Sequence, residues 1–247
     1  MLLKFYADES YNNRAFNLGG CLAEESTWST VERQWLKRIE YERRKHGKLD
    51  RYHAADCASR KRDYKDWSER EQILHAKKLL GIMTRKRADV VAMAFGVDLP
   101  AMTRLFGRRK SDGPLAGAYN LCARKLMMMI YQVVTRNQGH RVAIIHDHTQ
   151  GYDGVILDAF NSMMDDPAVP HYKGLFTTIA PMRWQDCVLL QPADMIVYDT
   201  FKLLNGTIFS TARLRKSLQA LVGQGVRVAA HYYGEAKLLE LRQTLSQ

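Results

Sequence analysis

Short apolar runs that end in turns and alternate with longer helical segments constrain the fold of this chain more than any other feature. Residues 2–7 form one such run and residues 15–23 a second, and polar residues 11–13 between them predict a β-hairpin. Further strands are expected near 52–55, 88–97, 141–145 and 175–180. A hairpin followed by alternating strands and helices predicts an α/β fold with a mixed central sheet flanked by helices.

Apolar residues at helical spacing predict helices over about 29–45, 68–83, 116–135, 152–164 and 188–204. Ser29 or Thr30 is a candidate N-cap for the first of these helices, and Ser68 for the second. The chain has 247 residues, which one large α/β domain can fill. We therefore expect a single domain over 1–247, in which residues 205–247 form a C-terminal helical extension with no assigned role.

Three carboxylates stand at positions where an isolated charge is costly. Asp8 follows the first apolar run, and Asp147 follows the β-branched run at 142–145. Side chains just beyond the carboxyl ends of neighbouring strands line the crevice in which α/β proteins bind ligands. Asp194 lies within an apolar helical stretch whose neighbours face the core, so its carboxyl must be protonated, paired with a base or bound to a cation.

A bound metal accounts for all three carboxylates together, because converging acids repel one another unless a cation neutralises them. Oxygen ligands suit Mg²⁺ or Mn²⁺, and two such ions about 4 Å apart can promote phosphodiester hydrolysis. We predict Asp8, Asp147 and Asp194 as catalytic and metal-binding residues. The competing interpretation is that a strand-end aspartate serves only as a turn or cap residue.

Four further residues are secondary candidates. His148 follows Asp147 where a turn is expected, and it is a candidate proton shuttle or phosphate contact. Glu9, next to Asp8, is a further catalytic candidate. His53 and Asp56 are candidate metal ligands. A lone histidine is more often structural, and this reading stays open for both histidines.

The chain is strongly basic, with 37 Lys and Arg against 26 Asp and Glu and a net charge of +11. Such an excess favours polyanionic partners, and its clustering favours nucleic acid, either DNA or RNA, although any single cluster can also be a solvated face. The candidate nucleic-acid-binding residues are Arg60, Lys61, Arg62, Arg85, Lys86, Arg87, Arg108, Arg109, Lys110, Arg213, Arg215 and Lys216. Trp28, Trp67 and Trp184 are candidates for stacking on bases, with packing in the core as the alternative.

Membrane association is not expected. The opening residues fit neither a signal peptide nor an anchor, and no stretch approaches the roughly 18 uninterrupted apolar residues of a membrane span. The four cysteines are scattered, without the spacing of a zinc site, so free thiols and a cytoplasmic location are expected.

Four sequence motifs carry a family resemblance, and they occur in a characteristic order and spacing over residues 2–204. They are FYADES, YHAAD, IIHDHTQ and LLQPADMIVYD. Together they resemble domain-of-unknown-function family 3800, which is assigned to the ribonuclease H-like superfamily. The first and last motifs are the most specific.

The resemblance implies a ribonuclease H-like mixed sheet and an acidic metal site built from the first strand, the fourth strand and a late helix. Asp8, Asp147 and Asp194 match those three positions. The superfamily usually adds a fourth acid, whereas this chain offers His53 and Asp56 without an unambiguous glutamate. Proteins of this kind are often found with mobile elements and phage defence, which implies a protein partner in such a complex.

The leading functional hypothesis is a metal-dependent nuclease that hydrolyses phosphodiester bonds of DNA or RNA. One alternative is a non-catalytic, basic nucleic-acid-binding subunit of a larger complex. A second is a metal phosphohydrolase of the HD type, because His53, His146-Asp147 and Asp194 follow its order of ligands. That fold is all-helical, whereas His146-Asp147 follows an expected strand.

Overall fold

The computed structural model describes residues 1–84, 90–107, 113, 115–135, 140–208 and 216–245. Its described strands form one six-stranded mixed sheet in the order β5-β4-β1-β2-β3-β6. Strand β2 is antiparallel to both of its neighbours, and every other neighbouring pair is parallel. The strands are β1 (Leu2–Tyr11), β2 (Ala15–Glu24), β3 (Val91–Asp98), β4 (Arg141–Asp147), β5 (Phe176–Met182) and β6 (Arg227–Tyr233).

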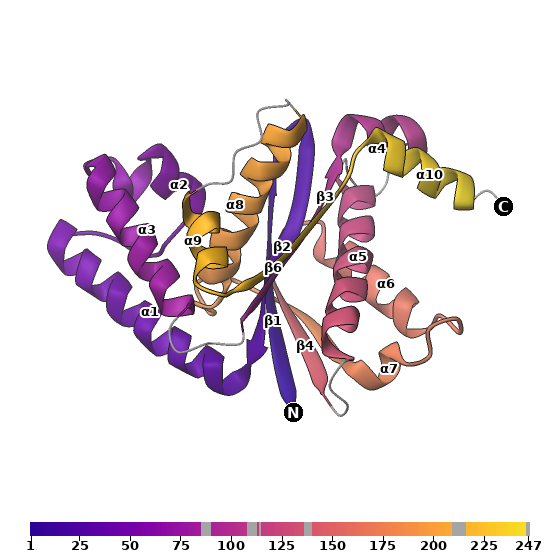
Figure 1. Cartoon of the computed structure of the whole chain (residues 1–247), viewed down its shortest axis with the longest axis horizontal. Coiled ribbons are helices and arrows are strands. Elements are labelled where there is room, and N and C mark those ends of the chain that lie inside the picture. The colour runs from indigo at the N-terminus through magenta and orange to yellow at the C-terminus, as the bar shows by residue number, and fades with distance from the viewer. Residues whose placement is uncertain (85–89, 108–112, 114, 136–139, 209–215, 246–247) are drawn as a thin grey trace.

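Helices cover both faces of the sheet (Figure 1). On one side lie α1 (Glu25–His46), α2 (Ala54–Ser59), the short 3-10 helix at Arg62–Tyr64, α3 (Glu69–Met83), α8 (Leu190–Ile208) and α9 (Lys216–Gly223). On the other lie α4 (Leu99–Phe106), α5 (Ala116–Val134), α6 (Asp153–Met164), α7 (Tyr172–Leu175) and α10 (Glu235–Leu245). The expected α/β architecture, with a mixed sheet between helices, is confirmed.

Alternation along β1 divides the core into two layers. Phe5 and Ala7 belong to the layer under α5 and α6, whereas Tyr6 packs with residues of α1 and α8 on the opposite face. Strand β2 is almost entirely buried because it lies in the middle of the sheet with helices on both sides. The periodicity of β1 therefore determines that Asp8 faces α8 and that Glu9 faces α5.

The structure differs from the sequence-based expectations at three elements. Helix α1 begins at Glu25, and the hydroxyls of Ser29 and Thr30 donate to the carbonyls of Glu25 and Ser26 within the helix instead of capping it. The strand expected at 52–55 is absent, since residues 52–53 have no regular structure and residues 54–55 begin α2. The expected helical extension also contains strand β6, which continues the sheet by pairing with β3.

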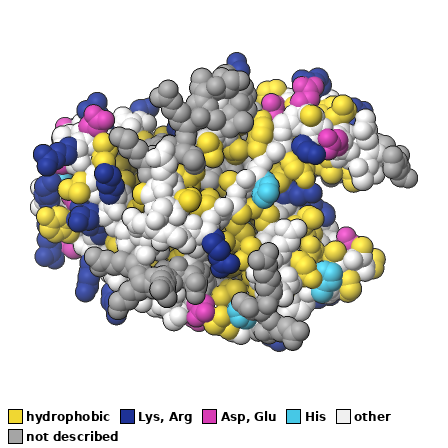
Figure 2. Space-filling model, viewed as in Figure 1, with side chains coloured by type: hydrophobic (Ala, Val, Ile, Leu, Met, Phe, Trp, Pro, Cys, Tyr) yellow, Lys and Arg dark blue, Asp and Glu magenta, His cyan; other side chains and the backbone are white. Residues whose placement is uncertain are grey.

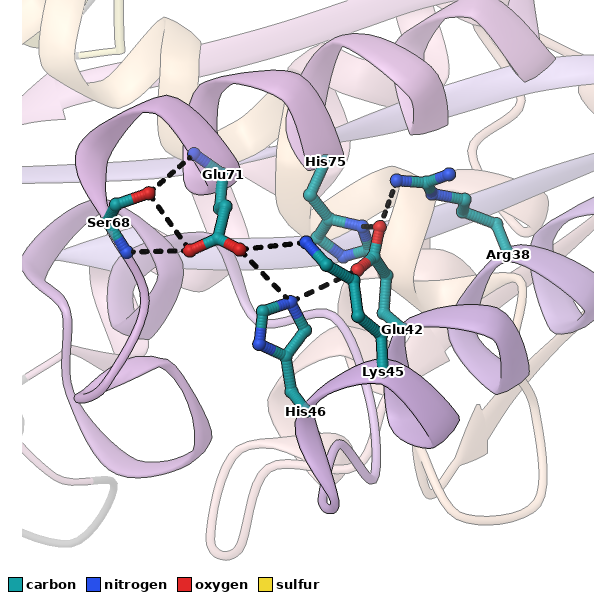
Figure 3. Close-up of polar contacts among 7 residues, drawn as sticks. All are labelled: Arg38, Glu42, Lys45, His46, Ser68, Glu71 and His75. Carbon is teal, nitrogen blue, oxygen red and sulfur yellow. Dashed lines mark hydrogen bonds and ion pairs between the residues drawn. The ribbon is translucent and has the colours of Figure 1, made fainter.

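A buried polar cluster joins α1 to α3 (Figure 3). Glu42 is 3% exposed, forms an ion pair with Arg38 and lies 3.8 Å from the Nδ1 of His75. The imidazole of His46 stacks on Trp67 with 4.0 Å between ring centroids. Ser68 caps α3 as predicted, in a capping box with Glu71. These contacts fix the two helices that flank the segment 47–68.

Within the described ranges, none of the helices combines the length and apolar character that crossing a bilayer requires. Every cysteine is buried with a free thiol, as the scattered spacing predicts.

Candidate acidic site

Asp8 and Asp147 lie side by side where the parallel pairing of β1 and β4 ends. Asp147 is the last residue of β4, as expected, whereas β1 continues past Asp8 to Tyr11 because its pairing with β2 extends that far. The register of β1 and β4 pairs Ala7 with His146, so the next residue along each strand is one of these two aspartates. Both follow residues that point away from α8, and strand alternation therefore directs both carboxylates toward the α8 face. The parallel pairing of two chain segments separated by more than a hundred residues is what brings the two acids together.

Asp194 reaches the same place from helix α8. It lies one turn into the helix, is 9% exposed, and its Oδ2 accepts a 2.7 Å hydrogen bond from the backbone N–H of Ala54. Ala54 is the first residue of α2, so this bond joins α8 to the segment that enters α2. The apolar neighbours of Asp194 hold α8 against the sheet, and its carboxylate is directed toward the two strand ends.

A cavity of about 170 Å³ lies between the strand ends, α8 and the segment before α2. The residues that line it are Asp8, Glu9, Arg51, Tyr52, His53, Asp147, Trp184, Leu190, Gln191 and Asp194. The three aspartates predicted as a group are therefore brought together on one concave surface. This surface lies outside the carboxyl ends of parallel strands, where α/β proteins bind ligands.

Burial and mutual repulsion dominate the electrostatics of this cavity. Burial, followed by the negative charges of Asp194, Glu9 and Asp147, raises the pKa of Asp8 well above its usual range. Burial raises the pKa of Asp194 to about 6, opposed by His53, the Ala54 N–H and Arg51. The pKa of Asp147 is raised as well, chiefly by burial. A divalent cation would remove this cost by neutralising the group as a whole.

One oxygen of each aspartate is already held by a backbone N–H. Asp8 Oδ1 accepts from Glu9 at 2.8 Å, and Asp147 Oδ1 accepts from His148 at 3.0 Å. In the part of the chain that the structure describes, no group of three or more His, Cys, Asp or Glu side chains is placed so that it could hold a metal ion as it stands. The donor chemistry nevertheless fits Mg²⁺ or Mn²⁺, which favour carboxylate oxygens and retain water at several coordination positions.

The secondary candidates fall into different places. His53 lines the cavity, and its Nδ1 lies 2.7 Å from Oδ2 of Asp56. Asp56 does not line the cavity and instead orients His53, as carboxylates behind histidine ligands commonly do. His148 is exposed and interacts with Asp153 on α6, away from the cavity lining.

Glu9 borders the cavity, but its carboxylate faces the opposite side of the sheet from Asp8. Its Oε1 accepts a hydrogen bond from the Thr149 hydroxyl at 3.0 Å. Burial raises the pKa of Glu9 to about 7, against the lowering effect of hydrogen bonds from Thr149 and Tyr119. The backbone of Glu9, which orients Asp8, is therefore closer to the acidic site than its side chain is.

Four cavity residues were not among the predicted site residues: Arg51, Tyr52, Leu190 and Gln191. Gln191 Oε1 accepts from the indole N–H of Trp35 and from the backbone N–H of Tyr52, both at 2.9 Å. Arg51 lies 4.1 Å above the ring of Trp184, measured from Cζ to the ring centroid. Gln191 belongs to the LLQPADMIVYD motif and could have been found there, whereas no local pattern marks Arg51.

The basic clusters are only partly covered by the structure. Arg60, Lys61 and Arg62 are exposed, and Arg60 and Arg62 adopt left-handed backbone conformations with φ of 50° and 51°. Arg62 Nε lies 3.5 Å from Asp56, so this loop adjoins the His53 side of the cavity. Lys216 begins α9, and nothing is described of its side chain. The other predicted basic residues, Arg85, Lys86, Arg87, Arg108, Arg109, Lys110, Arg213 and Arg215, lie outside the described residues.

Of the predicted tryptophans, Trp28 and Trp67 are buried in the core, and Trp184 is partly exposed at the cavity. His146-Asp147 closes strand β4, whereas an HD-type phosphohydrolase would place this pair on a helix of an all-helical fold. Comparisons with models of known protein families and with curated proteins return no match for this chain. The resemblance to family 3800 therefore stays a prediction.

Proposed function

We propose that this chain is a nuclease of the ribonuclease H-like kind that hydrolyses phosphodiester bonds with Mg²⁺ or Mn²⁺. The observation that carries the proposal is the meeting of Asp8, Asp147 and Asp194 around one polar cavity. These acids come from the first strand, the fourth strand and a late helix, which are the positions expected from the family resemblance. The antiparallel β1–β2–β3 unit, extended by parallel β4 and β5, also supports it.

The chain's own residues have separable roles in this proposal. Asp8, Asp147 and Asp194 would hold the cation, which supplies positive charge to the reacting phosphate when bound. Backbone N–H groups of Glu9, His148 and Ala54 fix the orientation of the three carboxylates. His53, held by Asp56, is a further polar contact at the same cavity.

The surface beside the cavity is suited to a polyanion. Lys and Arg side chains gather on the side of the molecule that carries α1, α2 and α3 (Figure 2). The exposed Arg60–Lys61–Arg62 loop belongs to this side and lies next to the acidic cavity through Arg62 and Asp56. Such a surface would bind the sugar-phosphate backbone without reading its sequence.

A cleavage assay tests the proposal directly. Labelled single- and double-stranded DNA, RNA and RNA–DNA hybrid are incubated with Mg²⁺ or Mn²⁺ and the wild-type chain, Asp147→Asn or Asp194→Asn. We expect each substitution to reduce cleavage about 100-fold or more, since a ligand to the cation contributes several kcal/mol to transition-state stabilisation. Asp158→Asn, on the exposed face of α6, is the matched control and should retain the wild-type rate.

The outcome also decides between catalysis and simple binding. Cleavage that is unaffected by both active-site variants would overturn the assignment of the acidic site. Salt-sensitive binding by a wild-type chain that cuts none of the substrates would instead favour a non-catalytic nucleic-acid-binding subunit. A protein partner in a defence or mobile-element complex would then be sought.

A further inference from the structure

Among the described residues, Arg51 contributes the one guanidinium that lines the acidic cavity. Its backbone is firmly placed, because its carbonyl accepts from the Tyr64 hydroxyl at 3.2 Å and the next residue, Tyr52, donates its N–H to Gln191. The side chain is partly buried. Arg51 is therefore a fixed part of the cavity wall, unlike the solvated arginines of the outer surface.

The guanidinium is held by an aromatic face and by no carboxylate. Its Cζ lies 4.1 Å from the Trp184 ring centroid, a distance typical of a cation–π contact. Within the part of the chain that the structure describes, this guanidinium takes part in no hydrogen bond or ion pair, although four acidic residues line the same cavity. Five N–H donors thus remain available beside an acidic centre.

Against the raising effect of burial, the charge of Arg51 lowers the pKa values of Asp147 and Asp194, but a direct ion pair does not account for this arrangement. A compensating arginine would pair directly with a carboxylate, because the planar guanidinium matches the two carboxylate oxygens. Stacking on Trp184 leaves the edge of the guanidinium open. The ligand chemistry that fits such an edge, next to a centre that would hold divalent cations, is an oxyanion with two or more oxygens.

We infer that Arg51 binds a non-bridging phosphate oxygen of the nucleic-acid strand and that Trp184 is the positioning residue that presents the guanidinium to it. This inference rests on the proposed function and names the side chain that holds the substrate phosphate there. Trp184 acts through Arg51, since its ring supports the flat face of the guanidinium and leaves the N–H edge free. The strand is thereby placed with a phosphate between Arg51 and the aspartates.

Equilibrium binding tests this assignment without requiring turnover. Anisotropy of fluorescein-labelled single-stranded 12-mers of DNA and RNA is measured in Ca²⁺ at several salt concentrations. Arg51→Gln should weaken binding about tenfold and reduce the magnitude of the salt slope by about 0.7, the loss of one phosphate contact on a single strand. Arg51→Lys should retain the salt slope while losing affinity, because it keeps the charge and not the bidentate edge.

The role of Trp184 is tested by paired substitutions. Trp184→Leu should weaken binding as Arg51→Gln does, whereas Trp184→Phe keeps an aromatic face and should recover most of the affinity. Intrinsic fluorescence gives a second readout, because the other three tryptophans are buried and only Trp184 is partly exposed. Binding of an unlabelled 12-mer should change wild-type emission, and this change should disappear in Trp184→Phe.

Arg141→Gln is the matched control, since Arg141 is an exposed arginine at the opposite end of β4. Wild-type affinity and salt slope in Arg51→Gln would overturn the inference, as would a loss of thermal stability with no change in binding. The proposed function fails separately. If the wild type binds through Arg51 but cleaves none of the substrates, the phosphate contact stands and the proposed catalysis is wrong. If Arg51→Gln cleaves with an unchanged KM, only the phosphate contact is wrong.

Discussion

At the scale of single residues, the two buried titratable centres of this protein behave in opposite ways. The acidic site holds carboxyl groups whose pKa values are raised by burial, so folding shifts their ionisation to higher pH. The cluster between α1 and α3 holds His75, whose two ring nitrogens lack hydrogen-bond partners within the described structure. Each centre therefore makes the free energy of unfolding depend on pH.

Asp8→Asn should stabilise the metal-free protein at neutral pH. A carboxyl whose pKa is raised by folding binds its proton more tightly in the folded state, so it costs stability once the pH exceeds the unfolded pKa of about 4. Asparagine stays neutral and its Oδ1 can still accept from the Glu9 N–H. We expect a gain of about 1 kcal/mol or more at pH 7.5, shrinking toward pH 4.

Urea denaturation in EDTA measures this difference, with Asp158→Asn as the control that should show no such trend. Adding Mg²⁺ or Mn²⁺ should then stabilise the wild type and leave Asp8→Asn largely unchanged. An Asp8→Asn protein less stable than wild type in EDTA at pH 7.5 would contradict the expected electrostatic strain.

His75 should make the protein lose stability as the pH falls below about 6.5. Burial, together with Arg38 and His46, lowers its pKa to about 3, so the unfolded chain takes up a proton first (Figure 3). Between these two pH values the wild type should lose up to about 1.4 kcal/mol per pH unit more than His75→Gln. Denaturation midpoints at pH 4 to 7 measure the slope, and parallel slopes would refute the expectation. His231→Gln, at an exposed position, serves as the control.

At the scale of secondary-structure elements, β1 and β2 are packed too closely for a side chain at Gly20. Gly20 on β2 pairs with Ala7 on β1, and a Cβ atom at Gly20 would overlap the backbone carbonyl of Tyr6. The obstacle is backbone, so no side-chain rotation relieves it. The same two strands place Asp8, which makes this contact important for the site as well as for the sheet.

Gly20→Ala should destabilise the protein by about 3 kcal/mol or more, or prevent folding, because it forces β1 and β2 apart. Gly81→Ala is the matched control: Gly81 lies in α3, where an added Cβ would meet open space, and alanine there should stabilise by about 0.5–1 kcal/mol. Thermal denaturation of both variants measures the contrast. Equal stability of the two alanine variants would show that the strands can separate without cost.

At the scale of the whole molecule, β6 protects an edge of the sheet. Strand β3 is buried along nearly its whole length, and it would be an apolar edge strand if β6 did not pair with it from Arg227 to Tyr233. Helix α10 follows β6 and packs against α4, and its residue Leu238 is buried. The C-terminal segment therefore completes the sheet that supports the acidic cavity.

A chain that ends at Gln224 should aggregate or dimerise, because it exposes the hydrogen-bonding edge of β3. A chain that ends at Gly234 keeps β6 and should stay closer to wild type in size. Size-exclusion chromatography with light scattering compares the two. Monomeric behaviour of the shorter chain, with an unchanged circular dichroism spectrum, would show that the edge is protected in another way.

Local patterns were sufficient for most elements and for the acids of the site. The hairpin, the buried α5 and the strand before Asp147 are visible because β-branched runs and helical spacing record which side of a segment is buried. Asp8 and Asp147 were found because each ends such a run. Asp194 was found because a carboxylate among apolar helical neighbours needs a partner.

Other features depend on contacts between distant parts of the chain. Arg51 and Trp184 meet only because α8 lies across the sheet and brings the segment before it against residues 50–53. Residues 50–53 remain outside the sheet because Gln191 and Asp194 bind the backbone N–H groups of Tyr52 and Ala54. The residues of β6 are only partly buried, and they form a strand because they pair with β3. Local sequence thus determined the elements and the acids, whereas tertiary packing decided the cavity wall, because its hydrogen bonds and ring contact join residues more than a hundred positions apart.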